Sequence, residues 1–189
     1  MGKLLENLHL TLLAGLVLAV AMIVAIPPDP VAPVVIVTWL HVFFGIVWIG
    51  LLYYFNFVQI PTMPSIPAEL KPGVTKFIAP KALFFFRWGA ALTVLTGLIV
   101  AHLNGYDAQA LMLQQGYRLI GIGMWLALVM AFNVWFVIWP NQKKALGLVE
   151  ADDATKAKAG RTAMLFSRAN TLLSIPMLLA MSAYTPVGA

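Results

Sequence analysis

Five runs of apolar residues in this chain are each long enough to cross a lipid bilayer as an α-helix. A helix rises about 1.5 Å per residue, so roughly 20 residues span the hydrocarbon layer. The sequence therefore predicts an all-α integral membrane protein, a bundle of five transmembrane helices in one domain over residues 1–189. The predicted helices extend over about 8–26, 34–58, 81–103, 117–139 and 163–183.

The composition supports the membrane assignment and excludes several classes of site. The chain is 61% hydrophobic and 10% charged, whereas a soluble domain has about 25% charged residues. Its net charge of +5 lies in the segments between the apolar runs, so we expect the charges to orient the protein and not to bind nucleic acid. The absence of cysteine excludes disulfides, iron–sulfur clusters and covalently attached haem.

The distribution of Lys and Arg predicts the orientation. Positively charged residues concentrate on the cytoplasmic side of membrane proteins, and only Arg118 falls on the opposite side from the others. We therefore predict a multi-pass protein of the bacterial inner membrane, with a cytoplasmic N-terminus and a periplasmic C-terminus. The eleven residues on the predicted cytoplasmic side are Lys3, Lys71, Lys76, Lys81, Arg87, Lys143, Lys144, Lys156, Lys158, Arg161 and Arg168.

Two segments between the apolar runs carry predictions of their own. Residues 59–80 contain several prolines and are predicted to be irregular, because proline removes a backbone donor and interrupts helices. Residues 150–160 mix charged residues with alanine and predict a short surface helix.

Two histidines lie near the predicted periplasmic ends of neighbouring spans. His41 belongs to the second apolar run and His102 to the third. Since consecutive spans are antiparallel, both imidazoles face the same side of the membrane. Two neutral imidazoles from facing helices can hold one haem iron axially. We therefore predict haem b as the cofactor, with His41 and His102 as the metal ligands.

The residues after His41 fit a flat, apolar cofactor. Gly45 lies one helical turn from His41 on the same face, where the missing side chain would let a macrocycle approach. Trp48 adds a large aromatic surface one turn further on. Both are predicted to contact the haem.

Other interpretations of the histidines stay open. An interfacial histidine can simply bond water, a headgroup or a backbone carbonyl. By the predicted boundaries His41 also lies several residues deeper than His102, so the second axial ligand could instead be a methionine, Met112 or Met124.

A second polar group lies in the predicted cytoplasmic half. It comprises Arg87, Asn133, Arg168 and Asn170. Charged side chains inside a membrane are costly, yet all seven acidic residues lie outside the spans or at their ends. Snorkelling to the interface would explain an arginine near a helix end. The alternative, which we predict, is that these residues bind an anionic or carbonyl-bearing guest.

Four stretches of the sequence resemble the membrane domain of bacterial urate hydroxylases, the urate oxidase N-terminal family. They are WLHVFFGIVWIGLLYYFN (39–56), APKALFFFRWGA (79–90), NVWFVIWPNQK (133–143) and SRANTLLSIPM (167–177). The family is also distantly similar to the haem-containing membrane protoporphyrinogen oxidases. The resemblance implies a membrane oxidoreductase that acts on urate and passes electrons to the respiratory chain. The family's full-length enzymes carry a cytochrome c domain, which this cysteine-free chain does not contain.

The sequence thus leads to one principal hypothesis and two alternatives. The principal hypothesis is a haem-b membrane redox protein that passes electrons from a small substrate to a quinone, a cytochrome or a larger respiratory complex. The first alternative is a non-catalytic accessory subunit of a larger membrane complex. The second is a small-anion transporter, although a transporter usually keeps a carboxylate within the membrane.

Overall fold

The computed structural model describes residues 2–26 and 33–184 and divides the chain into two compact units, Met1–Ile36 and Val37–Ala189. We describe each unit by itself. The predicted periplasmic C-terminus lies outside the described residues, and the predictions of orientation and of a single domain stay predictions.

The first unit consists of helices α1 (Gly2–Leu5) and α2 (Leu8–Ala25). Asn7 caps α2, because its Oδ1 accepts hydrogen bonds from the backbone N–H groups of His9 at 3.0 Å and Leu10 at 3.3 Å. Every residue of α2 is apolar except for His9 and Thr11 in the first turn. Such a helix is hydrophobic on all sides, which is typical of a membrane span.

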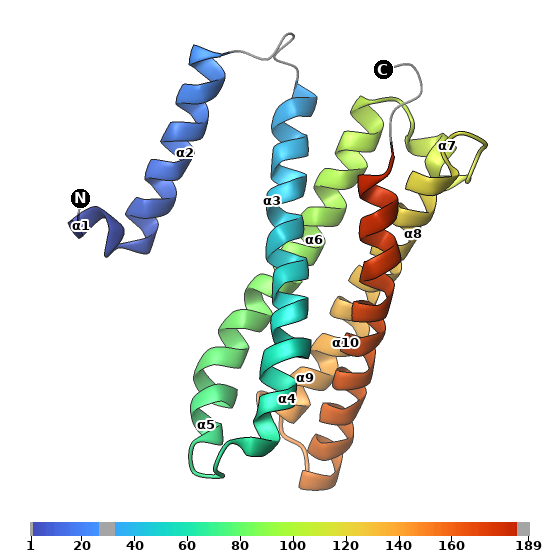
Figure 1. Cartoon of the computed structure of the whole chain (residues 1–189). Coiled ribbons are helices and arrows are strands. Elements are labelled where there is room, and N and C mark those ends of the chain that lie inside the picture. The colour runs from blue at the N-terminus through green and yellow to red at the C-terminus, as the bar shows by residue number, and fades with distance from the viewer. Residues whose placement is uncertain (1, 27–32, 185–189) are drawn as a thin grey trace. The chain divides into compact units, whose positions relative to one another are not determined.

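The second unit is a bundle of long helices with short helical connections (Figure 1). Consecutive long helices are antiparallel, so α3 and α8 run one way while α6 and α10 run the other. The long elements are α3 (Pro33–Tyr53), α6 (Ala79–Leu103), α8 (Arg118–Phe132), which α9 (Trp139–Ala145) continues, and α10 (Asp153–Ser182). The short ones are α4 (Ile60–Thr62), α5 (Lys71–Gly73) and α7 (Asp107–Leu111).

The described residues contain five helices long and apolar enough to cross a membrane, and no strand. The predicted class, an all-α protein with five transmembrane helices, is confirmed. The chain is therefore a multi-pass membrane protein. The spans are Leu8–Ala25, Pro33–Ser65, Lys71–Leu103, Arg118–Ala145 and Asp153–Ser182.

Several predicted boundaries were wrong at one end of the bundle. The second span continues to Ser65 and the third begins at Lys71, so most of the segment predicted to be irregular is helical. The predicted surface helix over residues 150–160 is instead the first part of α10. Asp152 starts this helix, because its Oδ1 accepts a hydrogen bond from the backbone N–H of Thr155 at 2.8 Å.

The prolines widen the helices instead of ending them. Each of three π-helical segments is followed within two residues by a proline: Tyr54–Gln59 by Pro61, Val74–Ile78 by Pro80, and Asn133–Ile138 by Pro140. A proline ring clashes with the carbonyl four residues earlier and supplies no N–H. A wider turn with bonds to the fifth preceding residue relieves the clash and lets the helix continue.

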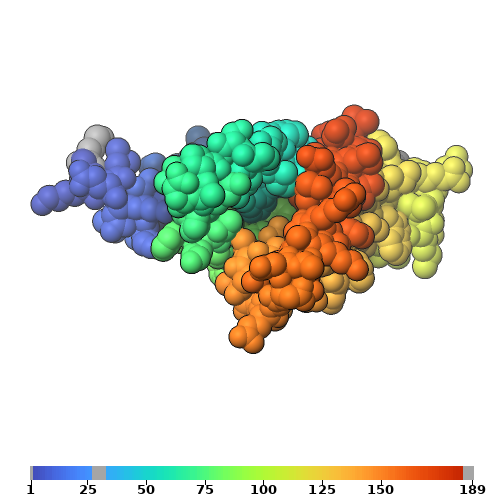
Figure 2. Space-filling model, turned by 90° about the horizontal axis from the view of Figure 1, so that it is seen from below, coloured from blue at the N-terminus to red at the C-terminus, as the bar shows by residue number. Residues whose placement is uncertain are grey.

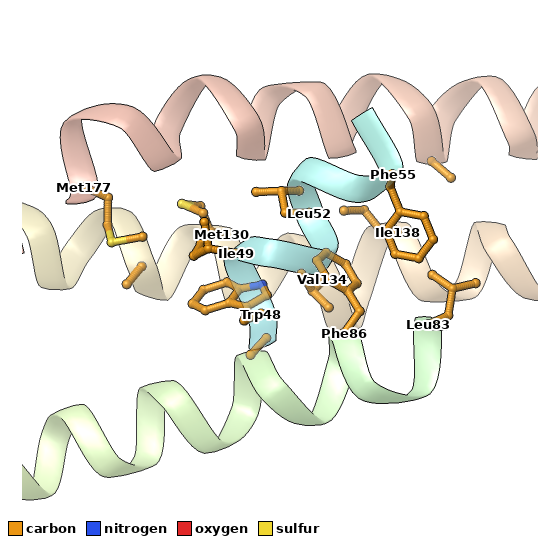
Figure 3. Packing of buried hydrophobic residues seen from close by; sticks show 13 residues of the cluster. Trp48, Ile49, Leu52, Phe55, Leu83, Phe86, Met130, Val134, Ile138 and Met177 are labelled. Carbon is orange, nitrogen blue, oxygen red and sulfur yellow. The ribbon is translucent and has the colours of Figure 1, made fainter. Parts of the chain in front are cut away.

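The core is formed by side chains of α3, α6, α8 and α10 and of the π-helical segments that continue α3 and α8 (Figure 3). Trp48 and Leu52 are fully buried, and Phe86, Met130 and Val134 lie against them. Lipid solvates apolar groups as well as a core does, so close packing and dispersion hold such helices together. Gly89 permits this packing, because a Cβ there would lie 3.3 Å from the backbone nitrogen of Trp48.

The two ends of the second unit differ in charge. The end formed by α4, α5, α9 and the start of α10 (Figure 2) carries most of the predicted cytoplasmic Lys and Arg residues; Lys3 belongs to the first unit, and Arg168 lies in the middle of α10. The opposite end, which includes α7, has Arg118. Below, we call them the cationic end and the α7 end.

Candidate functional site

A cavity of about 650 Å³ lies between α3, α6, α8 and α10 in the half of the bundle nearest the α7 end. Its walls are largely apolar, and its polar groups are few. Some lining residues of α3 are themselves exposed, among them Val42 and Ile46 at 53% and 68%. The cavity is therefore open on this side of the bundle. Its volume is within the range of about 300–1,000 Å³ that is usual for ligand sites.

His41 lies in the wall of this cavity with its ring orientation fixed. Its Nδ1 donates a hydrogen bond to the backbone oxygen of Thr93 on α6 at 2.9 Å. The proton is then on Nδ1, and the lone pair of Nε2 is left for another partner. Histidines that ligate a metal are commonly held in this way, with one ring nitrogen bound to a carbonyl and the other to the metal.

Gly97 provides the space for the imidazole. A Cβ at this position would lie 2.7 Å from Cε1 and 3.0 Å from Nδ1 of His41. Any side chain here would push the ring away from α6 and break its hydrogen bond to Thr93. In the sequence Gly97 resembles the other small residues of this span, so only the structure links it to His41.

Gly45 and Trp48 line the same cavity as His41, as their predicted role requires. A Cβ at Gly45 would have a single neighbour, the Cγ2 of Thr93 at 3.8 Å, which is an ordinary contact. Packing within the protein therefore does not require glycine there. Trp48 is fully buried, and its indole N–H has no hydrogen-bond partner among the described residues.

His102 is not brought to the cavity. Its side chain is 78% exposed, and its Nδ1 lies 3.0 Å from Oδ2 of Asp107 at the start of α7. This hydrogen bond is the main reason why the pKa of Asp107 lies below its usual value. The structure does not assemble the predicted pair of axial ligands, His41 and His102.

The cavity wall contains methionines, which could bind a metal in place of His102. Met124 on α8 and Met177 on α10 are both almost fully buried, and Met181 is partly buried. A thioether can complete the axial coordination of a haem iron. The sequence indicated Met124 as an alternative ligand, whereas Met177 and Met181 have no signal beyond their residue type.

Hydroxyl groups lie in the part of the cavity wall nearest the α7 end. They belong to Tyr106, Ser182 and Tyr184. The ring centroids of Tyr106 and Tyr184 are 5.3 Å apart. The Ser182 hydroxyl donates to the backbone oxygen of Leu179 at 3.2 Å, so the two tyrosine hydroxyls are the groups of this part of the wall that can donate hydrogen bonds to the polar edge of a ligand.

The four residues predicted to bind an anionic guest are distributed over three places. Asn133 and Asn170 bond to each other, since Nδ2 of Asn133 donates to Oδ1 of Asn170 at 2.9 Å. Asn170 also donates to the backbone oxygen of Met130 at 2.9 Å. Both side chains are buried, so their principal contacts connect α8 with α10.

The two arginines of that group lie on different flanks. Arg168 is exposed and lines a shallow recess of about 420 Å³ with Asn56 and Thr171. The guanidinium carbon of Arg87 lies 3.4 Å from the ring centroid of Trp139 on α9. The Nε and Nη1 atoms of Arg87 are buried and have no hydrogen-bond partner in the described part of the chain.

The fold and the cavity define the class of protein: a multi-pass helical membrane protein with an internal apolar site that contains one oriented histidine. Residues 106–187 match the model of a known family, described as urate oxidase N-terminal. The match supports the predicted relationship to this family over that part of the chain. No curated protein and no solved structure matches the chain.

Proposed function

We propose that the chain is a haem-b-binding membrane redox protein. The observation that carries the proposal is the free Nε2 of His41, which is oriented through Thr93 and lies in an apolar cavity of cofactor size. When bound, haem would supply one-electron chemistry at its iron.

The residues of the cavity fit the three parts of a haem. His41 would hold the iron, and the apolar walls beside Gly45 would accept the macrocycle. The hydroxyls of Tyr106 and Tyr184 would hold the propionates. Met124, Met177 or Met181 would supply a second ligand to the iron. His102 is a weaker candidate, because its side chain is exposed and bonded to Asp107.

The family relationship supports an oxidative role. A urate-oxidase-related protein would take electrons from a small substrate, with urate implied by the family. The cavity is open beside Val42 and Ile46, so a membrane-soluble acceptor such as a quinone could approach the cofactor from the bilayer. A cytochrome or a larger respiratory complex would instead receive electrons at the α7 end. In the other half of the bundle, Arg168 lines an open recess and remains the proposed contact for an anionic substrate. Asn133 and Asn170 bond to each other and Arg87 lies on another flank, so these three do not share that recess.

An absorption spectrum of protein purified from haem-replete cells tests the proposal. We expect a Soret band and reduced-minus-oxidised difference bands in the wild type. His41→Ala should abolish them, because no other imidazole lines the cavity. His102→Ala is the matched control and should retain the bands. Colourless wild-type protein that is folded would contradict haem binding. Loss of the bands in His102→Ala but not in His41→Ala would place the haem at the α7 end, outside this cavity.

A further inference from the structure

We propose that the flank between α6 and the continuous helix α8–α9 binds an anionic phospholipid, whose phosphate is held by Arg87 and Lys143. This inference is independent of haem binding. Arg87 would bind a lipid and not a soluble substrate. Lys143, which the sequence did not indicate as a binding residue, would be the second contact to the phosphate.

Two cations converge on one aromatic ring at this flank. The guanidinium carbon of Arg87 lies 3.4 Å from the centroid of Trp139, and Nζ of Lys143 lies 5.7 Å from the same centroid. The ring attracts both groups, but the two positive charges repel each other. Neither forms an ion pair with an acidic residue in the described part of the chain. An anion bound between them would remove the repulsion.

Arg87 also has unused hydrogen-bonding capacity. Its Nε and Nη1 are buried without a partner, and buried N–H groups normally have one. Its backbone oxygen accepts a hydrogen bond from the indole of Trp135 at 3.2 Å, which ties α6 to the π-helical segment before α9. The guanidinium lies against Trp139, its Nε and Nη1 have no partner among the described residues, and a phosphate is a natural acceptor for them.

Beside the two cations the flank is aromatic and apolar. The rings of Trp88 and Trp135 meet edge to face at 5.5 Å, and Trp88 lies 6.5 Å from Phe84. Trp88 and Phe84 are 47% and 48% exposed. Trp135 precedes Trp139 by one helical turn, so the aromatic surface continues directly from the cationic one. Trp135 and Trp88 extend this apolar surface away from the cationic end, where the acyl chains of a phospholipid would lie, whereas Phe84 lies nearer the headgroup.

The position of the flank favours a lipid over a free anion. Arg87 and Lys143 belong to the cationic end of the bundle, which the positive-inside rule places in the cytoplasm. The cytoplasmic leaflet carries the anionic lipids that attract such residues. A small soluble anion would use the cations alone and leave the exposed Trp88 and Phe84 without a role.

Native mass spectrometry of delipidated protein with added phosphatidylglycerol or phosphatidylcholine tests the inference. We expect the wild type to retain phosphatidylglycerol preferentially. Arg87→Gln and Lys143→Gln should each reduce this preference about fivefold, as expected for the loss of one cation near an anionic lipid. Lys144→Gln is the matched control, because Lys144 is exposed at the same end and is not among the cations on Trp139. It should change little.

Three outcomes would overturn the inference. The first is equal retention of the two lipids by the wild type. The second is an equal loss in Lys144→Gln, which would indicate only a diffuse surface charge. The third is full competition by inorganic phosphate, which would identify a soluble anion. If Arg87→Gln does not fold, Lys143→Gln alone tests the inference. Lys143 is only partly buried, so this variant is expected to fold. The Soret band of the same samples reports haem separately, so failure of one proposal is distinguishable from failure of the other.

Discussion

The two halves of the second unit are built from the same long helices but are packed differently. The half near the cationic end contains the dense core around Leu52, Phe86 and Val134, the Asn133–Asn170 pair and the three π-helical segments. The half near the α7 end contains a cavity of about 650 Å³ with one oriented histidine. The difference indicates that one half holds the helices together, which leaves the other free to surround a ligand. Substitutions in the two halves should therefore have separable effects.

The largest expected effect on stability is in the packed half. Phe86 is 1% exposed and its ring meets that of Phe55 at 5.6 Å. Phe86→Ala should lower the free energy of unfolding by about 3–5 kcal/mol through the cavity it leaves. Thermal unfolding in detergent, followed by size-exclusion chromatography, would measure this. Phe85→Ala is the control, because Phe85 is 51% exposed. Equal loss in both variants would contradict the location of the core.

Asn170→Leu should give a smaller loss in the same half. The substitution removes two hydrogen bonds and leaves Nδ2 of Asn133 without its partner. We expect a cost of about 1–3 kcal/mol, as is typical for a buried polar group left unpaired. The same unfolding assay measures it, and haem content per folded protein should stay unchanged. A loss of haem without a loss of stability would instead support the predicted role of Asn170 in binding.

Gly97→Ala should act in the open half and affect the ligand more than the fold. The new Cβ would lie 2.7 Å from Cε1 of His41, so the ring must move and lose its bond to Thr93. We expect haem content to fall at least several-fold, while the melting temperature changes by only a few degrees. Gly50→Ala is the control, because Gly50 lines the same cavity and its Cβ would have no neighbour within 4 Å. Haem loss in Gly50→Ala alone would contradict the proposed position of the ring.

The smallest expected effect is at the α7 end and depends on pH. The hydrogen bond from His102 lowers the pKa of Asp107, so Asp107 stabilises the folded state above its unfolded pKa of about 3.9. That contribution is lost as the pH falls through the lower, folded-state value. The protection factors of the α7 amides, which compare the exchange rate with the intrinsic rate at the same pH, should therefore decrease below about pH 4 in the wild type. In Asp107→Asn this decrease should be absent. The same acid response in both proteins would contradict the role of the pair.

The sequence predicts the helices of this protein much better than the rotation of each helix about its axis. The lengths of the apolar runs and the positions of the charged residues were sufficient to predict the five spans. They also placed His41 and His102 near the same end of the bundle. They could not show that His102 faces outward to Asp107. Successive residues of a helix point about 100° apart, so an error of one residue in the rotation of a helix exchanges a cavity-facing position for an exposed one. The prolines led to wrong predictions of the helix ends. Pro61, Pro80 and Pro140 suggest that a helix stops, but a π-helical turn before each proline lets the helix continue.

The features of the site that were missed depend on contacts between distant residues. Gly97 supports His41 across 56 positions of the sequence, and Met177 reaches the same cavity from the last helix. Lys143 joins Arg87 only through the ring of Trp139. Nothing in the local sequence around these residues indicates the contact each one makes. The four residues predicted to bind one guest had similar depth in the membrane, but depth alone does not bring side chains together.

Titration of cofactor-free protein with haemin tests the central claim most directly. The account predicts that the wild type binds one haemin per chain until saturation, with a spectrum of an imidazole-ligated iron. It also predicts that folded His41→Ala shows no saturable binding. Binding by this variant with the same stoichiometry and spectrum as the wild type would show that the imidazole of His41 does not hold the iron. The proposed function of the cavity would then be wrong.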